Sequence, residues 1–180
     1  EFESYGFAIN LSNIESKIME ADDYVFFWKT NEKFGFLSNW YMEDFYSYGV
    51  KYNCSEQYIM AAKAKLFNDE EAYEKIMKSD DPQKQKRIGR AIKNFNQSTW
   101  DHFINPIAFM ACYSKFQFSD LKHKLIDIIK RGKTPVETSP VDSIWGVGYD
   151  AENALQNRDK WGQNILGLNL NAVGNLFLNH

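Results

Sequence analysis

Several features of common protein classes are missing from this sequence of 180 residues. No apolar run approaches the roughly 18 residues that a membrane-spanning helix needs, and the N-terminus has no basic-then-apolar secretory pattern. The two cysteines, Cys54 and Cys112, are far apart, and a domain of this size does not depend on a disulfide for stability. We therefore expect a soluble, cytoplasmic protein with reduced thiols and no membrane partner.

The sequence also lacks the residue patterns of several ligand-binding chemistries. Its three histidines, His102, His123 and His180, form no Cys/His/carboxylate cluster with zinc-like spacing. Neither of the glycine-rich loops that usually cradle phosphates, GxxxxGK(S/T) and GxGxxG, is present. A net charge of -3 gives no general attraction to polyphosphate, so any phosphate must be held in a defined site. We expect no metal and no organic cofactor.

Hydrophobic and aromatic residues are plentiful, at 44% and 16%, which suffices for one sizeable core. The β-branched and aromatic run from Tyr24 to Trp28 predicts a strand, and residues 39–52, with a turn at Gly49, predict further short β structure. Helical periodicity dominates from Ser55 onward. These patterns predict a mainly α (α+β) fold: a single compact helical domain over residues 24–180 with a small β-sheet near its N-terminal part, preceded by an extension over residues 1–23.

Capping residues and helix breakers predict where the helices begin and end. The predicted helices cover residues 13–20, 55–66, 68–77, 81–95, 98–118, 119–132 and 165–177. Asn68 and the Asp81-Pro82 pair are the expected starts of two of them, and Pro106 is expected to bend the longest. Residues 133–148, with two prolines and two glycines, are predicted to form a loop.

That loop combines a carboxylate and an indole three residues apart. Asp142 and Trp145 would lie on one side of a turn-like arc, where Trp145 could stack on a base or sugar and Asp142 could face a positively charged ring. Gly146 and Gly148 leave the backbone bare enough for a ligand to approach closely. The alternative is a structural loop with a buried tryptophan and an aspartate that makes a turn hydrogen bond.

Two predicted helices carry further candidates for ligand contact. Glu56 and Lys63 are seven residues apart, which places them on one helix face about 10 Å apart, a spacing that suits a ribose and its phosphate. In the first turn of the helix, the helix dipole favours the ionised form of Glu56, which suits a general base. The alternative is that Glu56 and Lys63 have no functional role, because a first-turn glutamate and a solvated lysine are common in helices. The helix predicted at residues 81–95 carries several basic residues. Arg90, which follows Gly89, suits bidentate phosphate contact. The other basic residues of this helix are expected to form a solvated face.

Taken in order, these segments resemble the YbiA-like, or NADAR, family. The matching segments are Phe36–Trp40, Tyr52–Lys63, Ile88–Arg90, Trp100, Met110, Lys115–Phe116, Glu137–Gly148 and Asn164–Gly167. Residues 137–148 contain the complete E-x-S-P-x-D-x-x-W-G-x-G pattern. The chain departs near its end, where members commonly have L-M-x-V-R and residues 170–174 read L-N-A-V-G. If that arginine holds a phosphate or the fold, the ligand preference of this chain differs.

The resemblance implies a hydrolase that cleaves the N-glycosidic bond of a phosphorylated ribosyl compound. Two substrates are known themes of the family: riboflavin-pathway intermediates, and ADP-ribose attached to guanine in nucleosides or DNA. The resemblance implies that the catalytic residues are Asp142, Glu56 and Trp145. It implies that the ligand is bound by Lys63, Arg90, Asn39, Gly146 and Trp100.

Our hypothesis for the reaction is dissociative hydrolysis, in which the ribose acquires oxocarbenium character as the bond to nitrogen lengthens. Asp142 would stabilise that charge, Glu56 would position or deprotonate water, and Trp145 would hold the ring, although the two acids could exchange roles. The alternatives are a non-catalytic ADP-ribose or nucleotide-binding module and an all-helical interaction domain without a pocket. The two acidic side chains favour the enzyme over the binding module. They repel an anionic ligand, so a protein that only binds this ligand would gain nothing from them.

Overall fold

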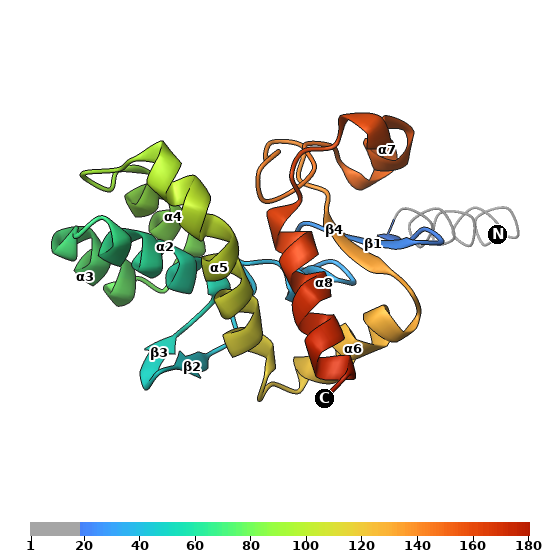
Figure 1. The fold of residues 1–180 in the computed structure, drawn as a ribbon, viewed down its shortest axis with the longest axis horizontal. Helices are drawn as coiled ribbons and strands as arrows, with labels where there is room; N and C mark the ends of the chain where they lie inside the picture. Colours follow the sequence, from blue (N-terminus) through green and yellow to red (C-terminus); the bar gives the residue numbers. More distant parts are fainter. Residues whose placement is uncertain (1–18) are drawn as a thin grey trace, which may run out of the picture.

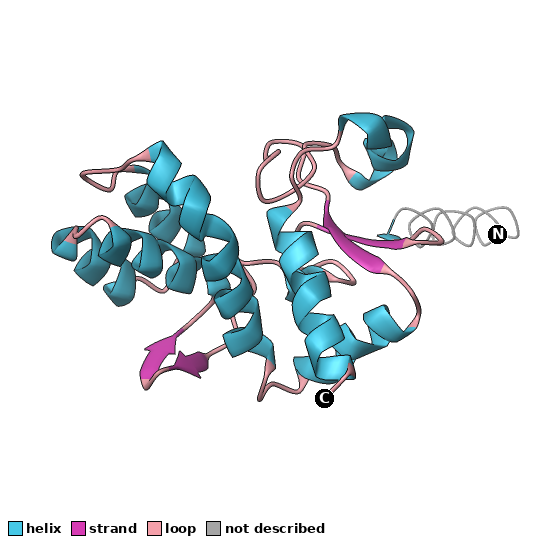
Figure 2. Cartoon of the chain, viewed as in Figure 1, coloured by secondary structure: helices cyan, strands magenta, loops and turns pink. Residues whose placement is uncertain are grey.

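The computed structural model describes residues 19–180, so most of the helix predicted at 13–20 lies outside the described residues. The helices are α2 (Ser55–Leu66), α3 (Glu70–Lys78), α4 (Pro82–Arg90), α5 (Gln97–Phe116), α6 (Leu121–Lys130), α7 (Ala151–Ala154) and α8 (Ile165–Leu178), with 3-10 turns η1 (Gly35–Leu37) and η2 (Leu155–Lys160). The strands are β1 (Tyr24–Phe27), β2 (Phe45–Ser47), β3 (Val50–Tyr52) and β4 (Thr134–Glu137). Figure 2 shows how far helix exceeds strand, and the predicted mainly α (α+β) class is confirmed.

The strands form two separate pairs. β2 and β3 make an antiparallel hairpin whose turn residues, Tyr48 and Gly49, both have positive φ, at 48° and 79°, as a type I′ turn requires. β1 and β4 pair in parallel, with Phe27 opposite Glu137. The prediction of a loop at residues 133–148 is therefore wrong at its start. Pro135 is tolerated in β4 because a two-stranded sheet consists of edge strands only.

Most helices begin close to the predicted residues, and side chains explain the differences. Asp69 rather than Asn68 caps α3, since its carboxylate accepts the N–H of the third helical residue at 3.1 Å. Asp81 caps α4 as expected, but that helix ends at Arg90, before Phe95. Asn96 caps α5, two residues before the predicted start at residue 98. Local capping chemistry thus sets the frame in which the functional side chains are placed.

The helix α5 separates two groups of elements (Figure 1). It contacts α2 on one side, where α3 and α4 also pack, and α8 on the other, where α6, β1 and β4 lie. Each side has its own apolar core, one built largely from α2–α5 and one from β1, α5, α6 and α8. Trp145 packs against both cores, so the loop that carries it lies where the two groups meet.

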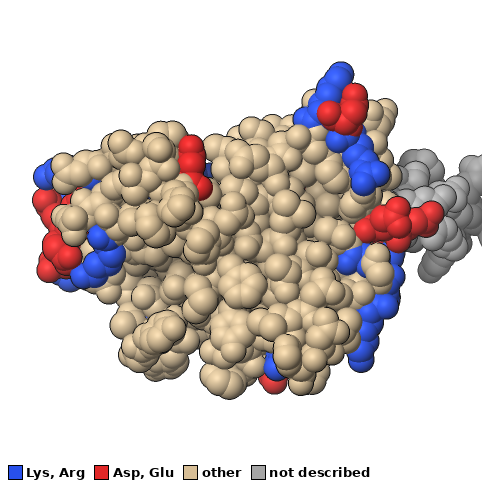
Figure 3. All heavy atoms as spheres, viewed as in Figure 1, with Lys and Arg blue, Asp and Glu red and all other residues tan. Residues whose placement is uncertain are grey.

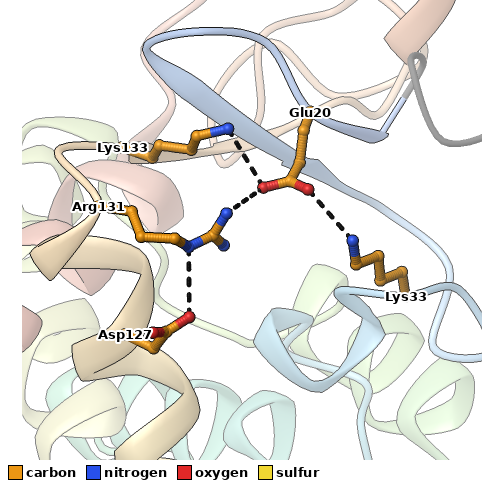
Figure 4. Close-up of polar contacts among 5 residues, drawn as sticks. All are labelled: Glu20, Lys33, Asp127, Arg131 and Lys133. Carbon is orange, nitrogen blue, oxygen red and sulfur yellow. Dashed lines mark hydrogen bonds and ion pairs between the residues drawn. The ribbon is translucent and has the colours of Figure 1, made fainter.

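A cluster of charged residues joins distant parts of the chain (Figure 4). The carboxylate of Glu20 contacts Arg131 at 2.6 Å, Lys33 at 3.1 Å and Lys133 at 3.3 Å, and Arg131 also contacts Asp127 at 3.2 Å. Burial alone would raise the pKa of Glu20, but hydrogen bonds from its three cationic partners hold it at about 2. The cluster fixes the chain that leads into β1 against the start of β4.

The surface has few charges on the face that Figure 3 shows. Lysine, arginine and acidic side chains gather at the two ends of this face, whereas the surface over α5 and α8 is largely uncharged. This face therefore offers no broad basic surface to a polyanion. Within residues 19–180, no helix is both long and apolar enough to cross a membrane.

Candidate active site

A cavity of about 690 Å³ lies between the carboxyl ends of β1 and β4 and the helices α2, α4 and α5. The carboxyl ends of parallel strands are a frequent place for ligand sites, and this volume suits a nucleotide-sized molecule. The lining residues are Trp28, Lys29, Thr30 and Asn31 after β1; Ser38, Asn39 and Trp40; Glu56, Met60 and Lys63 of α2; Lys86 and Arg90 of α4; Trp100 of α5; and Glu137, Ser139, Val141, Asp142, Ile144 and Trp145.

The structure brings seven of the eight residues expected from the sequence to this cavity, namely Asp142, Glu56, Trp145, Lys63, Arg90, Asn39 and Trp100. Gly146 is the exception, because it lies behind the wall rather than on it. Sequence reasoning missed Glu137, which closes β4, and Lys86, which was assigned to a solvated face. The helical spacing of Lys86 and Arg90, one turn apart on α4, was the available signal for the second of these.

Asp142 combines the two interpretations that the sequence left open. Its Oδ1 accepts the backbone N–H groups of Ile144 and Trp145, each at 2.9 Å, so it does make a turn of the loop. Asp142 also lines the cavity. Its second carboxylate oxygen takes no part in the hydrogen bonds of the turn. The hydrogen bonds that shape the loop therefore also orient the carboxylate and set the position of the indole beside it.

The loop is held rigidly by the start of α8. Backbone N–H groups of residues 163–166 donate to the carbonyl groups of residues 143–146, at 2.8–3.1 Å. Asn164, in the left-handed region at φ 49°, bonds β4 through its side chain: Oδ1 accepts from the Glu137 N–H at 3.0 Å and Nδ2 donates to the Pro135 carbonyl at 3.2 Å. Asn164 thereby completes the free edge of β4 and fixes the strand end on which Glu137 stands.

Glu56 is 7% exposed and its N–H donates to the Asn39 carbonyl at 2.9 Å. Burial, together with the charge of Asp142, raises the pKa of Glu56 to about 7, against the opposing charges of Lys86 and Lys63. Near neutral pH Glu56 is therefore only partly ionised, because loss of solvent opposes the helix dipole that favours its ionised form. A carboxyl group that titrates near pH 7 suits proton exchange with water.

Lys63 is held in place rather than solvated. Its ammonium donates to the Gly89 carbonyl at 2.9 Å and lies 4.8 Å from the ring centre of Phe95 and 5.3 Å from that of Trp100. Burial lowers its pKa. A second cavity, of about 610 Å³, adjoins the first and shares Lys63, Trp100 and Trp145 with it. The two recesses together give room for a ligand longer than one ribose phosphate.

The segment that carries Asn39 depends on a buried lysine. Lys115 of α5 is 2% exposed, and its ammonium donates to the carbonyl oxygens of Phe36 at 2.6 Å and Ser38 at 3.0 Å. Burial lowers the pKa of Lys115 to about 8. Lys115 does not line the cavity, but it fixes the turn from which the Asn39 carbonyl reaches Glu56.

The C-terminal departure from the family pattern does not reach the site. A Cβ at Gly174 would press against Ile129 and Leu125 of α6, so this position is part of the contact between two helices. It is not among the residues that line either cavity. The missing arginine thus corresponds to a position at the contact between α6 and α8. For metals, the part of the chain that the structure describes contains no group of three or more histidine, cysteine or acidic side chains placed to hold an ion.

Gly146 supports the site by leaving space. A Cβ at this position would lie 2.6 Å from the carbonyl oxygen and 2.7 Å from Oε2 of Glu137. Because β4 and Asn164 fix that strand end, Gly146→Ala is expected to lower the free energy of unfolding by roughly 2 kcal/mol. Urea denaturation should show this loss, with Val141→Ala, 85% exposed in the same loop, as a control that changes stability by less than about 0.5 kcal/mol. Equal stability of the two variants would contradict the packing described.

Comparison with known proteins agrees with this architecture. The NADAR domain model matches residues 26–176. N-glycosidase R617 of Acanthamoeba polyphaga mimivirus is 38% identical over 83% of this chain and 93% of its own length. Protein irg-1 of Caenorhabditis elegans is 34% identical, covering 69% of this chain and 60% of its own. The solved structure of the E. coli protein YbiA shares the fold, with a TM-score of 0.71 and 24% identity over 89% of each chain. The chain belongs to the NADAR domain family.

Proposed function

We propose that this protein is an N-glycosidase that hydrolyses the bond between C1′ of a phosphorylated ribosyl group and a nitrogen of a planar base. The observation that carries the proposal is the meeting of Glu56, Asp142 and Trp145 in one cavity, with Lys63 and Arg90 on the neighbouring helices. Carboxylates suit a ribosyl cation, an indole suits a flat ring, and cations suit a phosphate. Each part of such a substrate thus has a matching group.

In this mechanism the C1′–N bond lengthens first, and positive charge develops on the ribose ring. Asp142 stabilises that charge through the oxygen that is not committed to the loop. Glu56 accepts a proton from the attacking water, as its pKa of about 7 allows. Trp145 holds the ring against the face opposite the water. No step requires a bound metal or an organic cofactor.

Names of relatives support the reaction class. The mimiviral protein is called an N-glycosidase, and a protein of Vibrio vulnificus that is 29% identical over 77% of this chain is called a riboflavin biosynthesis protein. The chain spans 36% of the length of that second relative. We propose two substrates that share the required chemistry: a riboflavin-pathway intermediate, and ADP-ribosyl-guanine as a nucleoside or in DNA. The adjoining recess suits the longer, ADP-ribosyl ligand.

The test is a turnover assay read by mass spectrometry. The protein is offered ADP-ribosylated guanosine, an ADP-ribosylated DNA oligonucleotide and a ribosylaminopyrimidine phosphate in parallel. Release of free ADP-ribose identifies the first class of substrate, and release of ribose 5-phosphate identifies the flavin-pathway class. Tight binding of ADP-ribose without turnover of any of the three substrates would refute the proposed enzymatic activity and establish a nucleotide-binding module.

A further inference from the structure

Glu137 is a third carboxyl group in the cavity, with a role that the mechanism above leaves open. It is the last residue of β4, opposite Phe27 of β1, and it lines the cavity. Its Oε2 is sealed from solvent, and no residue from 19 to 180 gives that atom a hydrogen bond. Since Oε2 is enclosed, Oε1 is the carboxyl oxygen that remains to face the cavity.

Because Oε2 is enclosed and has no hydrogen-bond donor, it indicates whether Glu137 is protonated or ionised. A carboxylate would place negative charge on Oε2 with neither water nor an N–H to stabilise it, which is costly. A protonated acid avoids this cost, because a neutral carbonyl oxygen is the least expensive polar atom to leave unpaired. The proton then belongs on Oε1, where it points toward the ligand space as a hydrogen-bond donor.

The backbone that carries the Glu137 side chain is fixed on both sides. The Glu137 N–H donates to Asn164 Oδ1 at 3.0 Å, and its carbonyl accepts the N–H of Val147 at 2.9 Å. The bare backbone of Gly146 lies directly behind Oε2. The strand end that bears the carboxyl group is thus held at one wall of the cavity by the start of α8 and by the loop that bears Asp142.

Electrostatics agree with the geometry. Burial, together with the charges of Asp142 and Glu56, raises the pKa of Glu137 to about 8, against the opposing charge of Lys86. Negative charge on one carboxyl group opposes ionisation of the next, so Glu56 and Glu137 lose their protons at different pH values. Near neutral pH Glu137 keeps its proton, while Glu56 exchanges its own.

We propose that Glu137 is the catalytic acid of this site, donating the proton on Oε1 to the leaving base as the C1′–N bond breaks. The proposal rests on the N-glycosidase function. The electron pair of the C1′–N bond goes to nitrogen, which takes the proton of Glu137. Water adds to C1′ and gives a proton to Glu56, and transfer of one proton from Glu56 to Glu137 restores both acids. The sum is one ribosyl-base and one water converted into the free sugar, with a new hydroxyl at C1′, and the free base, with a new N–H.

The test is Glu137→Gln, which keeps the shape and a donor N–H but has no proton to give away. We expect its kcat to fall at least about 100-fold on the substrate that the turnover assay identifies, with Kd for that substrate changed less than about threefold. The wild type should lose activity as pH rises through about 8, and the variant should lack this alkaline limb. Exposed Glu152→Gln is the control, expected to match the wild type in both respects. A variant within threefold of wild-type kcat, or with the same alkaline limb, would overturn the proposal.

A second measurement tests the protonation state of Glu137 and does not require turnover. Infrared difference spectra of wild type and Glu137→Gln at pH 7 should show one protonated carboxyl C=O stretch that the variant lacks and that disappears in the wild type above about pH 8. Absence of that band means that Glu137 is ionised and refutes the assignment, even in a folded, active enzyme. If the band is present and none of the substrates is cleaved, the N-glycosidase function has failed and the catalytic assignment falls with it.

Discussion

Asp142→Asn should lower kcat by about 10²–10³-fold while the protein stays as stable as the wild type. Asparagine keeps the side-chain oxygen that accepts the N–H groups of Ile144 and Trp145, so the loop retains its shape. What it loses is the negative charge that faces the developing ribosyl cation. The effect should therefore appear in kcat at saturating substrate, measured by product release, and not in the denaturation curve.

Two further variants separate charge from structure at this position. Asp142→Ala removes the turn hydrogen bonds as well, and is expected to lose about 1 kcal/mol of stability together with its activity. Asp120→Asn, at an exposed aspartate remote from the cavity, should change neither quantity. Full turnover by Asp142→Asn would remove Asp142 from the mechanism.

Glu56→Gln should lower kcat by about 10²–10⁴-fold and abolish the acidic limb of the pH profile. In the wild type, activity should rise with pH through about 7, since Glu56 accepts a proton from water only after it has lost its own. Because the carboxyl groups interact, the limbs of a measured profile belong to the group of acids as a whole, and the variants assign them. Glu74→Gln on the exposed face of α3 serves as the control.

The same pKa makes a prediction about stability. Glu56 has a folded-state pKa above its usual 4.5, so its protonated form favours folding, fully below pH 4.5 and less as pH rises through about 7. Relative to Glu56→Gln, the wild type should therefore lose free energy of unfolding between about pH 4.5 and pH 7. Urea denaturation of both proteins at pH 5 and pH 8 measures the difference. A difference that does not change with pH would contradict the burial of this carboxyl group.

Local chemistry made much of the fold predictable. The aromatic strand at Tyr24, the turn at Gly49 and the Asp81-Pro82 helix start are all signals carried by neighbouring residues, and the structure contains each of them. The strand β4 was not predictable in this way. Its pairing with β1 joins segments far apart in the chain, and Pro135 gives its sequence the appearance of a loop.

The site divides in the same manner. The spacing of Glu56 and Lys63 on a helix, and of Asp142 and Trp145 in a loop, predicted pairs that the structure places on one cavity. The protonation of Glu56 and the position of Glu137 were beyond reach, since both depend on which distant elements exclude water from the cavity. Lys86 and Arg90 share one face of α4, yet only the packing of α4 against α2 shows that this face meets the site.

Hydrolysis in water enriched with ¹⁸O tests the central claim most directly. Cleavage of the C1′–N bond by water at C1′ predicts one ¹⁸O atom in the released sugar and none in the base or in any phosphate, with labelled sugar reduced at least about 100-fold for Asp142→Asn. Label in a phosphate group, or base release that persists unchanged in the variant, would contradict N-glycoside hydrolysis at this cavity.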